Sequence, residues 1–508
     1  MQNNSSQSDS FQVSPEGSEY SALFWFRRDL RLQDNAGLSA ALSDHARVFC
    51  VFVFDREILD QLSTPMDRRV EFIWHSVQQL DQALRARGSV LIQAHGAARE
   101  QIPSLAQRLG VRAVYANRDY EPQAMARDAA VAQALKTQGR EWLSFKDQVV
   151  FEGDDILTRA GGPYTVFTPY GKTWRAAITP THLASHSCPE GRWATQIQVE
   201  QSLQSSGAAV LPAKSLQQLG FQTTNLLDLG IKPGFLGAQQ AWDSFQERMD
   251  RYHEQRDFPA LPGVSWLSVH LRFGTVSIRS LVQLALERNT LGSLTWLNEL
   301  IWREFYFAIL FHFPHVVEQA FRKEMDAVPF ETDPVLFQRW QQGLTGFPIV
   351  DAAMRQLQHS GYMHNRLRMI AASFLVKDLG IHWRWGESHF AQQLNDYDLS
   401  ANNGGWQWCA STGCDAQPWF RIFNPSTQSR RFDPQGHFIR RYLPELSAIP
   451  SEKIHQPALL SLQEQTQYGC RLGVDYPYPV VDHAQARQNT LQRYAIAAQA
   501  KEAGQRGA

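Results

Sequence analysis

The run Val48-Phe-Cys-Val-Phe-Val-Phe54 decides the fold class of the first part of this chain. An unbroken apolar run of this length is typical of a strand that is buried on both faces, as in a parallel sheet. Similar short runs at 22–26, 90–92 and 113–115 alternate with helical periodicity at 66–87 and 101–109. Residues 21–150 are therefore predicted to form an α/β domain with a parallel, Rossmann-like sheet. No G-x-G-x-x-G sequence follows these strands, so a dinucleotide fingerprint is absent.

The second half of the chain has a different periodicity. Leu294, Leu297, Ile301, Phe305 and Ala308 fit one buried helical stripe, and strand-like runs are missing beyond about residue 238. An all-helical domain is therefore predicted to follow the α/β domain. The complete division is a disordered tail at 1–20, the α/β domain at 21–150, a connector at 151–235, the helical domain at 236–482 and a C-terminal helix and tail at 483–508.

Composition excludes several classes of protein. The 508 residues are 43% hydrophobic and 19% charged, which is ordinary for a globular chain, and the net charge of −1 excludes a generally basic nucleic-acid coat. Five cysteines without close pairing are no disulfide framework and suit a reducing compartment. No apolar run is long enough to span a membrane. We expect a soluble, cytoplasmic, monomeric protein without a metal site.

The least ordinary stretch is Asn395-Asp-Tyr-Asp-Leu-Ser-Ala-Asn-Asn-Gly-Gly-Trp-Gln-Trp408. A capped helix end with inward-packed tryptophans explains any one of these residues. It does not explain all of them together, because so many polar groups beside two tryptophans need partners when they are buried. A planar ligand that forms hydrogen bonds would satisfy both features.

Three other segments have a similar character. Glu299, Trp302 and Arg303 share one helical face, although a surface ion pair between Glu299 and Arg303 would also explain the pattern. Segment 364–369 places polar groups against an otherwise apolar helix, for which a helix N-terminus is the simpler interpretation. The stretch 421–441 contains five arginines and one acid, and beside an aromatic pocket it suggests a phosphate-backbone ligand. A solvated loop is the alternative, which the charge alone would favour.

These motifs resemble the photolyase/cryptochrome flavoproteins, and most closely the class I cyclobutane pyrimidine dimer photolyases. The resemblance runs from Phe24-Trp-Phe-Arg-Arg-Asp-Leu-Arg31 to about Leu446. Its most specific pieces are 256–260, 299–305, 345–355, 364–369, 398–408 and 421–425. The family joins an α/β antenna-chromophore domain to a helical domain that binds FAD and DNA. This agrees with the two halves predicted above.

The resemblance implies a set of FAD-binding residues. Asp396 and Asp398 are expected to face the ribityl and isoalloxazine region, with Arg368 paired to Asp396. Asn402 is expected beside flavin N5, where plant cryptochromes have Asp, so Asn402 favours repair. The residues expected around the phosphates and nearby are Tyr252, Ser265, Leu267, Ser268 and Trp296.

The resemblance also implies a pocket for a flipped-out pyrimidine dimer. Trp302 and Trp408 would replace the stacking that the thymines lose, and Glu299 would bind the thymine edge. Asn365 and Met369 would line the same pocket, where (6-4) photolyases have His at the Asn365 position. The residues that match DNA-backbone contacts are Arg256, Arg303, Arg366, Arg421 and Gln428.

The implied activity is light-driven repair of pyrimidine dimers in damaged DNA, by electron transfer from reduced FAD to the dimer. The alternatives are a cryptochrome-type blue-light photoreceptor without repair activity, and a flavin electron-transfer protein that never binds DNA. A second antenna chromophore is expected, of folate, deazaflavin or flavin type.

The family re-reduces its flavin through a tryptophan chain. Trp406 matches the flavin-proximal member and Trp383 the middle one, but the outer position is Phe330. Because Phe is much harder to oxidise than Trp, we expect slow photoreduction that Phe330→Trp would accelerate, unless Trp385, Tyr397 or Trp419 takes over the last step.

Overall fold

The computed structural model describes residues 20–205 and 214–506, so the predicted tail at 1–20 lies outside the described residues except for Tyr20. Its N-terminal part is a five-stranded sheet in the order β3-β2-β1-β4-β5, with every pair parallel. The strands are β1 (Ser21–Phe26), β2 (Arg47–Asp55), β3 (Leu91–Gly96), β4 (Ala113–Asn117) and β5 (Glu141–Phe145). The predicted parallel α/β domain is confirmed.

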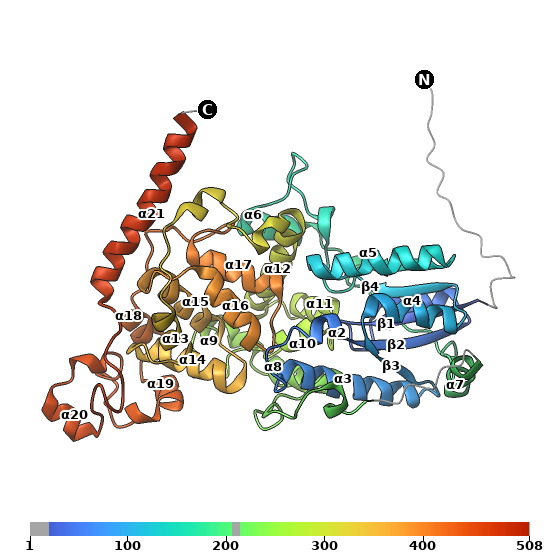
Figure 1. The fold of residues 1–508 in the computed structure, drawn as a ribbon, viewed down its shortest axis with the longest axis horizontal. Helices are drawn as coiled ribbons and strands as arrows, with labels where there is room; N and C mark the ends of the chain where they lie inside the picture. The colour runs from blue at the N-terminus through green and yellow to red at the C-terminus, as the bar shows by residue number, and fades with distance from the viewer. Residues whose placement is uncertain (1–19, 206–213, 507–508) are drawn as a thin grey trace.

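The apolar strands are buried on both faces. Phe24 and Phe26 of β1 pack into one core, whereas Leu23 and Trp25 pack into another on the opposite face. Helices α1 (Ala36–Asp44) and α3 (Arg68–Arg85) contribute to the first core, and α4 (Ala98–Arg108) and α5 (Pro122–Thr137) contribute to the second. Figure 1 shows this sheet with helices on both sides.

The sequence analysis did not predict β5 or the helices of the connector. Strand β5 has one strand neighbour, β4, and its five residues mix charged, polar and aromatic side chains. The connector contains α6 (Phe167–Ala177) and α7 (Gln196–Ser205). Only Tyr170, Gly171 and Trp174 of α6 are buried, so its apolar pattern is too short to detect as periodicity.

The second half of the chain is helical, as predicted. Its longest helices are α12 (Leu291–His312) and α21 (His483–Arg506). The others used below are α8 (Gly234–Gln246), α9 (Tyr252–Gln255), α10 (Ser268–Phe273), α11 (Ile278–Arg288), α15 (Asn365–Ser373), α16 (Trp383–Gln393), α17 (Leu399–Ala410) and α18 (Pro425–Phe432), with a π-helical turn η8 (Phe374–Asp378) after α15.

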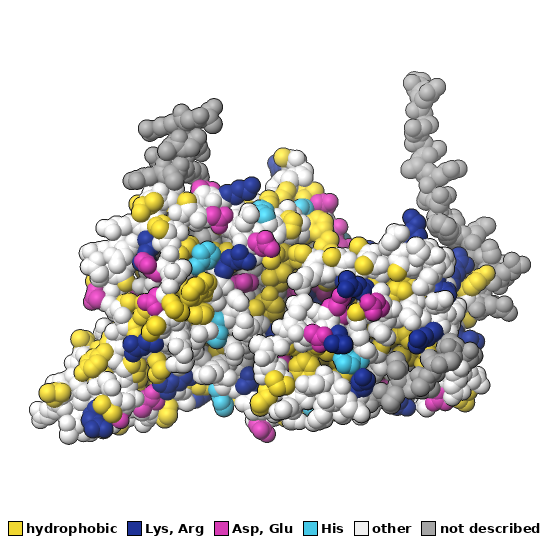
Figure 2. Space-filling view, viewed as in Figure 1, with side chains coloured by type: hydrophobic (Ala, Val, Ile, Leu, Met, Phe, Trp, Pro, Cys, Tyr) yellow, Lys and Arg dark blue, Asp and Glu magenta, His cyan; other side chains and the backbone are white. Residues whose placement is uncertain are grey.

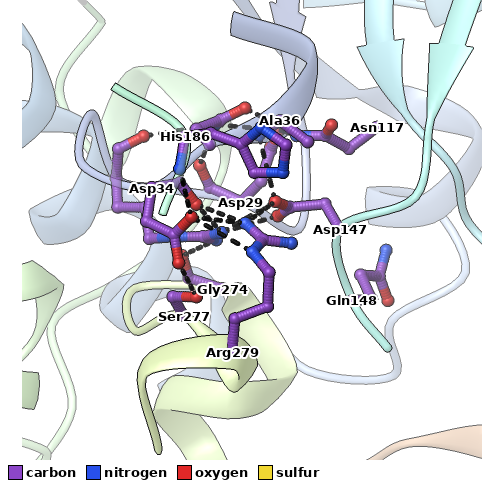
Figure 3. Close-up of polar contacts among 12 residues, drawn as sticks. Asp29, Asp34, Ala36, Asn117, Asp147, Gln148, His186, Gly274, Ser277 and Arg279 are labelled. Carbon is purple, nitrogen blue, oxygen red and sulfur yellow. Dashed lines mark hydrogen bonds and ion pairs between the residues drawn. The ribbon is translucent and has the colours of Figure 1, made fainter. Parts of the chain in front are cut away.

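A buried polar cluster joins the two parts (Figure 3). Arg279 of α11 donates to Asp147 (2.8 Å) and Asp34 (3.0 Å), and Arg31 donates to Asp147 (2.8 Å). Although burial opposes ionisation, the two guanidinium groups hold the pKa of Asp147 below its usual range. At Gly274, where φ is +61°, an added Cβ would lie 2.0 Å from the Arg28 carbonyl oxygen, so only glycine permits this close approach of the domains.

His270 lies at the same junction and makes folding depend on pH. It is buried in α10, its Nδ1 lies 2.8 Å from Thr275 Oγ1, and its ring lies against Phe72 of α3. Burial lowers the pKa of His270 to about 4. The unfolded chain therefore binds a proton near pH 6.5 that the folded chain binds only near pH 4, so this stabilisation is lost as the pH falls between these values.

We expect His270→Asn to weaken this dependence, because the amide can replace the hydrogen bond of Nδ1 without titrating. The free energy of unfolding of the wild type, relative to that of this variant, should fall by about 3 kcal/mol as the pH is lowered from 7 to 4. Urea denaturation at a series of pH values measures it, with the exposed His437→Asn as the control. Parallel pH curves for the wild type and His270→Asn would contradict the assignment.

Within residues 20–205 and 214–506, no helix has the length and hydropathy needed to cross a membrane. Over the same ranges, no three His, Cys, Asp or Glu side chains are grouped so that they could bind a metal ion.

Candidate flavin and DNA site

Helix α17 carries three predicted site residues, Asn402, Trp406 and Trp408. Asp398 begins this helix as its N-cap, since its Oδ1 accepts hydrogen bonds from the backbone N–H groups of Ser400 (3.2 Å) and Ala401 (3.4 Å). Gly404 lets α17 approach α12 closely, because an added Cβ would lie 2.2 Å from the ring of Tyr306. The Asn-Gly-rich sequence is thus part of a helix, and Gly404 allows that helix to pack closely against α12.

The second oxygen of Asp398 points to the domain junction. Oδ2 accepts from Arg28 at 2.5 Å and from Arg272 at 3.4 Å, and Arg28 also lies 3.1 Å from both Asp119 and Glu121. Burial opposes the charge, but Arg28 and Arg272 hold the pKa of Asp398 well below its usual range. The carboxylate predicted to face the flavin therefore ties α17 to the α/β domain.

A cavity of about 360 Å³ lies beside the loop that precedes α10. Ser268 and Asp396, two of the predicted FAD-binding residues, line it together with Tyr362 and Trp266. Asp396 is paired with Arg368 (2.9 Å), as the resemblance implied. Trp266 has φ +60° and its ring lies 4.2 Å from that of Tyr362, so the two aromatic rings form one wall of the cavity.

The predicted phosphate-binding residues lie in and around the loop before α10. Ser265 and Ser268 flank Trp266 in the chain, and Leu267 is buried with its N–H 3.4 Å from Ser265 Oγ. Arg248, also a cavity residue, donates to the Val264 carbonyl oxygen (3.1 Å) and so supports this loop. Tyr252 and Trp296 are buried in the adjacent core, where both rings contact Phe245.

Asn402 has a partner that the sequence analysis did not name. Its Nδ2 donates to the Glu387 backbone oxygen (3.1 Å) and to Glu387 Oε1 (3.2 Å). Burial raises the pKa of Glu387. Glu387 follows Trp383 by four residues on α16, so both side chains lie on the same face of that helix. This spacing is the signal in the sequence that could have indicated Glu387 as a site residue.

The residues present fit a bound FAD. Ser268, Asp396 and the aromatic wall of Trp266 and Tyr362 line the cavity, and Arg368 pairs with Asp396, whereas Ser265 and Asn402 lie outside the cavity lining. Hydroxyl, charged and aromatic groups of this kind suit a molecule with phosphates, hydroxyls and a planar ring. In addition, Nε1 of the buried Trp406 has no hydrogen-bond partner among the described residues.

Glu299 is half-buried on α12 and pairs with Arg256 at 2.7 Å. Burial raises the pKa of Glu299, and the Arg256 guanidinium opposes that rise. The alternative explanation of the sequence spacing, a surface ion pair between Glu299 and Arg303, is wrong: Arg303 instead donates to the Gln148 carbonyl oxygen (2.7 Å) and lies over Phe307. Arg303 thereby joins α12 to the α/β domain, and its DNA contact stays a prediction.

Trp302 is held by a residue that sequence reasoning missed. The ring of Phe167, from α6, stacks on Trp302 with 3.7 Å between centroids and 7° between planes. The buried Glu304 holds the connector to α12, accepting N–H groups from Val150 (2.6 Å) and Phe151 (3.0 Å) and from the indole of Trp174 (2.5 Å). No periodicity in the connector could have shown that Phe167 reaches this site.

The remaining pocket residues lie on α15 and α17. Arg366 links them to the Glu299 region, since it pairs with Asp257 (2.8 Å) and donates to Met369 Sδ (3.7 Å). Asn365 is exposed, and Met369 and Trp408 are half-buried against the same core. Cys409, the residue after Trp408 on α17, also contacts α15, because its Sγ donates to the Met369 carbonyl oxygen (3.7 Å).

The predicted basic stretch 421–441 divides into two groups. Arg421 is exposed before α18 and Gln428 is half-buried on it, where both are available to a ligand. Arg440, in contrast, donates to the Ser447 (3.1 Å) and Ile449 (2.7 Å) carbonyl oxygens and so stabilises the chain itself. On the face of the molecule seen in Figure 2, the described basic and acidic side chains are interspersed.

Comparison with known proteins decides the family. Residues 22–190 match the family model described as DNA photolyase, and 296–496 match the FAD binding domain of DNA photolyase. The deoxyribodipyrimidine photo-lyase of a Synechococcus strain is 41% identical over 91% of this chain and 93% of its own length. The chain belongs to the DNA photolyase family.

Two solved structures show that the fold of this DNA photolyase family member is also similar to those of known relatives. A class III photolyase from Agrobacterium tumefaciens has a TM-score of 0.85 and 34% identity, covering 97% of this chain and 100% of its own. A cryptochrome from Synechocystis has a TM-score of 0.81 and 28% identity, covering 94% and 99%. The predicted family and architecture are confirmed, whereas the class within the family and the exact domain boundaries stay predictions.

Proposed function

We propose that this photolyase repairs cyclobutane pyrimidine dimers in DNA by light-driven electron transfer from bound, reduced FAD, and is a deoxyribodipyrimidine photo-lyase. One observation supports this most. Glu299 and Trp302 lie on one face of α12, where Arg256 pairs with Glu299, and Arg366, paired with Asp257, is close enough to act on the charge of Glu299. A carboxylate, an aromatic platform and nearby cations match the thymine edge, the thymine ring and the DNA backbone respectively.

Bound FAD would supply one electron to the dimer after absorbing light and take it back once the cyclobutane ring has opened. Asp396, held by Arg368, would bind the polar parts of the cofactor, and Asn402 would present its amide to the ring. The Asn402 amide is fixed by Glu387, so it would keep its orientation when the charge of the ring changes.

The protein would hold the dimer with side chains that replace the base stacking and base pairing that the dimer loses when it leaves the duplex. Trp302 and Trp408 replace base stacking, and Phe167 behind Trp302 keeps that ring in place. Asn365 and Met369 complete the walls. As a carboxylate, Glu299 would accept a hydrogen bond from the thymine imide N–H. Once protonated, it would donate to the thymine carbonyl oxygen and so stabilise the extra electron on the dimer.

The backbone contacts lead to a prediction about Arg421, which is exposed before α18. We expect Arg421→Ala to weaken binding to damaged and undamaged DNA alike, because phosphate contacts are independent of sequence, and to reduce the slope of log affinity against log salt by about 1. Fluorescence anisotropy at several salt concentrations measures both. Arg112→Ala, which removes an exposed arginine of the α/β domain, is the control; an unchanged slope in Arg421→Ala would refute the phosphate contact.

The decisive test of the function is repair of ultraviolet-irradiated oligothymidine under blue light by chemically reduced enzyme. Recovery of undamaged thymines in light, and none in darkness, is expected. Light-induced changes in the flavin spectrum without any repair would instead favour the photoreceptor alternative. The similarity to the Synechocystis cryptochrome is the reason to test that alternative. Mass spectrometry of the released chromophores would identify FAD and any second, antenna chromophore of folate, deazaflavin or flavin type.

A further inference from the structure

The surroundings of Phe330 contain a continuous series of aromatic rings that leads to the surface. Trp383 lies 5.8 Å from His382, between ring centroids, and His382 lies 4.8 Å from Phe330. The ring of Phe330 lies 6.5 Å from that of Tyr494 on α21, and Tyr494 lies 6.3 Å from Trp419. The outer position of the predicted tryptophan chain is therefore not an isolated phenylalanine.

Tyr494 is fixed in this series by its neighbours. It is buried, and its hydroxyl donates to the Ala410 carbonyl oxygen at the end of α17 (2.5 Å). Lys377 of η8 lies over its ring at 3.9 Å and donates to Ser411 Oγ (2.9 Å) and to the Trp419 carbonyl oxygen (3.3 Å). Helix α21, the turn η8 and the loop after α17 thus hold the Tyr494 and Trp419 rings in one arrangement.

His382 and Phe330 are also half-buried but are harder to oxidise than an indole, so Trp419 is the readily oxidised member of the series that reaches solvent. Its ring is parallel to that of Tyr494, with 3° between the planes, and it is half-buried between the exposed Pro418 and Phe420. Trp383, in contrast, is 1% exposed. An electron vacancy on Trp383 has no direct access to a reductant in solution, whereas one on Trp419 does.

We propose that Trp419 is the outermost electron donor for light-driven reduction of the bound flavin, and that Tyr494, Phe330 and His382 connect it to Trp383. This inference rests on the proposed function, because it requires a flavin beside Trp406. In this proposal, Trp419 takes the role of outermost donor that a tryptophan at position 330 would otherwise have, and Tyr494 of the C-terminal helix α21 is part of the connection.

The vacancy should rest on Trp419 rather than on Tyr494, for a chemical reason. A phenol is readily oxidised only when its proton can leave, and the Tyr494 hydroxyl donates to a backbone carbonyl oxygen, which is too weak a base to take that proton. When Lys377 is protonated, its charge over the Tyr494 ring also opposes a positive charge there. An indole can lose its electron first and its proton later, to water.

Transfer of one electron from Trp406 to photoexcited flavin leaves a radical cation on Trp406, which Trp383 reduces and thereby becomes the radical cation itself. Trp419 then reduces Trp383 and releases its N–H proton to water, which leaves a neutral tryptophan radical. A thiol in solution restores Trp419 by giving up a hydrogen atom and becomes a thiyl radical.

A second aromatic branch begins at Trp406 and competes with this path. Trp340 lies 6.1 Å from Trp406, Phe337 lies 5.7 Å from Trp340, and Trp385 lies 5.2 Å from Phe337. Trp385 is half-buried. This branch bypasses Trp383, so substitution of Trp385 separates the two paths.

The test is transient absorption of the FAD-loaded protein after a laser flash, read at the bands that distinguish tryptophan from tyrosine radicals. We expect a long-lived tryptophan radical in the wild type, and Trp419→Phe to reduce its yield about tenfold or more. Trp142→Phe, a half-buried tryptophan of the α/β domain, is the matched control and should leave the yield unchanged. Adding Phe330→Trp to the Trp419→Phe variant should restore the signal, which a merely misfolded variant would not do.

A second measurement does not depend on flavin spectra. Prolonged illumination in air without thiol should leave oxygenated products on Trp419, located by peptide mass spectrometry. An unchanged radical yield in Trp419→Phe, a long-lived tyrosine radical, or loss of the signal in Trp385→Phe would each overturn the proposal. Chemically reduced Trp419→Phe should still repair DNA at the wild-type rate, so failure of this inference leaves repair intact, whereas failure of the proposed function abolishes repair in the wild type as well.

Discussion

Replacement of Asp398 by alanine is expected to lower the free energy of unfolding by about 3–5 kcal/mol, because it leaves the buried guanidinium of Arg28 without its nearest carboxylate. The same change removes the N-cap of α17, a further cost of about 1 kcal/mol. Since α17 carries Asn402, Trp406 and Trp408, retention of FAD should fall together with stability. Urea denaturation and the ratio of flavin to protein absorbance measure the two effects.

Ser400→Ala is the matched control for this prediction. It removes the hydroxyl that donates to Asp398 Oδ1 (2.5 Å) and leaves the ion pairs with Arg28 and Arg272 in place. We expect a loss of only about 1 kcal/mol. If Asp398→Ala were no less stable than Ser400→Ala, the ionic connection between the two domains would contribute nothing.

Replacement of Glu299 by alanine is expected to lower repair of damaged DNA about 10- to 100-fold while FAD stays bound. The thymine edge loses a charged hydrogen-bond partner, which is worth about 1.5–3 kcal/mol. Arg256 at the same time loses its ion-pair partner and is free to move toward the DNA backbone. Binding to undamaged DNA should therefore be unchanged or slightly tighter, whereas binding to damaged DNA weakens.

The measurement is the repair yield per absorbed photon, together with anisotropy titrations of damaged and undamaged duplexes. Glu254→Ala is the control, because it removes an exposed carboxylate from neighbouring helix α9. Equal losses of affinity for both duplexes in Glu299→Ala would show that Glu299 acts on the backbone and not on the dimer.

Several parts of the site could be predicted from the sequence because they are local. Asp396 and Arg368 form the expected pair, and the stretch from Asn395 to Trp408 contains a capped helix beside the candidate flavin site. Arg28 could not be recognised as the partner of Asp398, because the contact joins residues 370 positions apart. Sequence spacing likewise suggested a Glu299–Arg303 pair that the structure replaces by Glu299–Arg256.

The sequence by itself determined the two-part architecture, since buried strands and helical stripes leave distinct periodicities in the chain. It also determined which residue types gather near α17 and α12. Only the tertiary structure decided where each charged or aromatic side chain points: Asp398 toward the domain junction, Phe167 onto Trp302, and Tyr494 between Phe330 and Trp419. The physical reason is that periodicity records burial, whereas the choice among possible partners depends on contacts between segments that are distant in the chain.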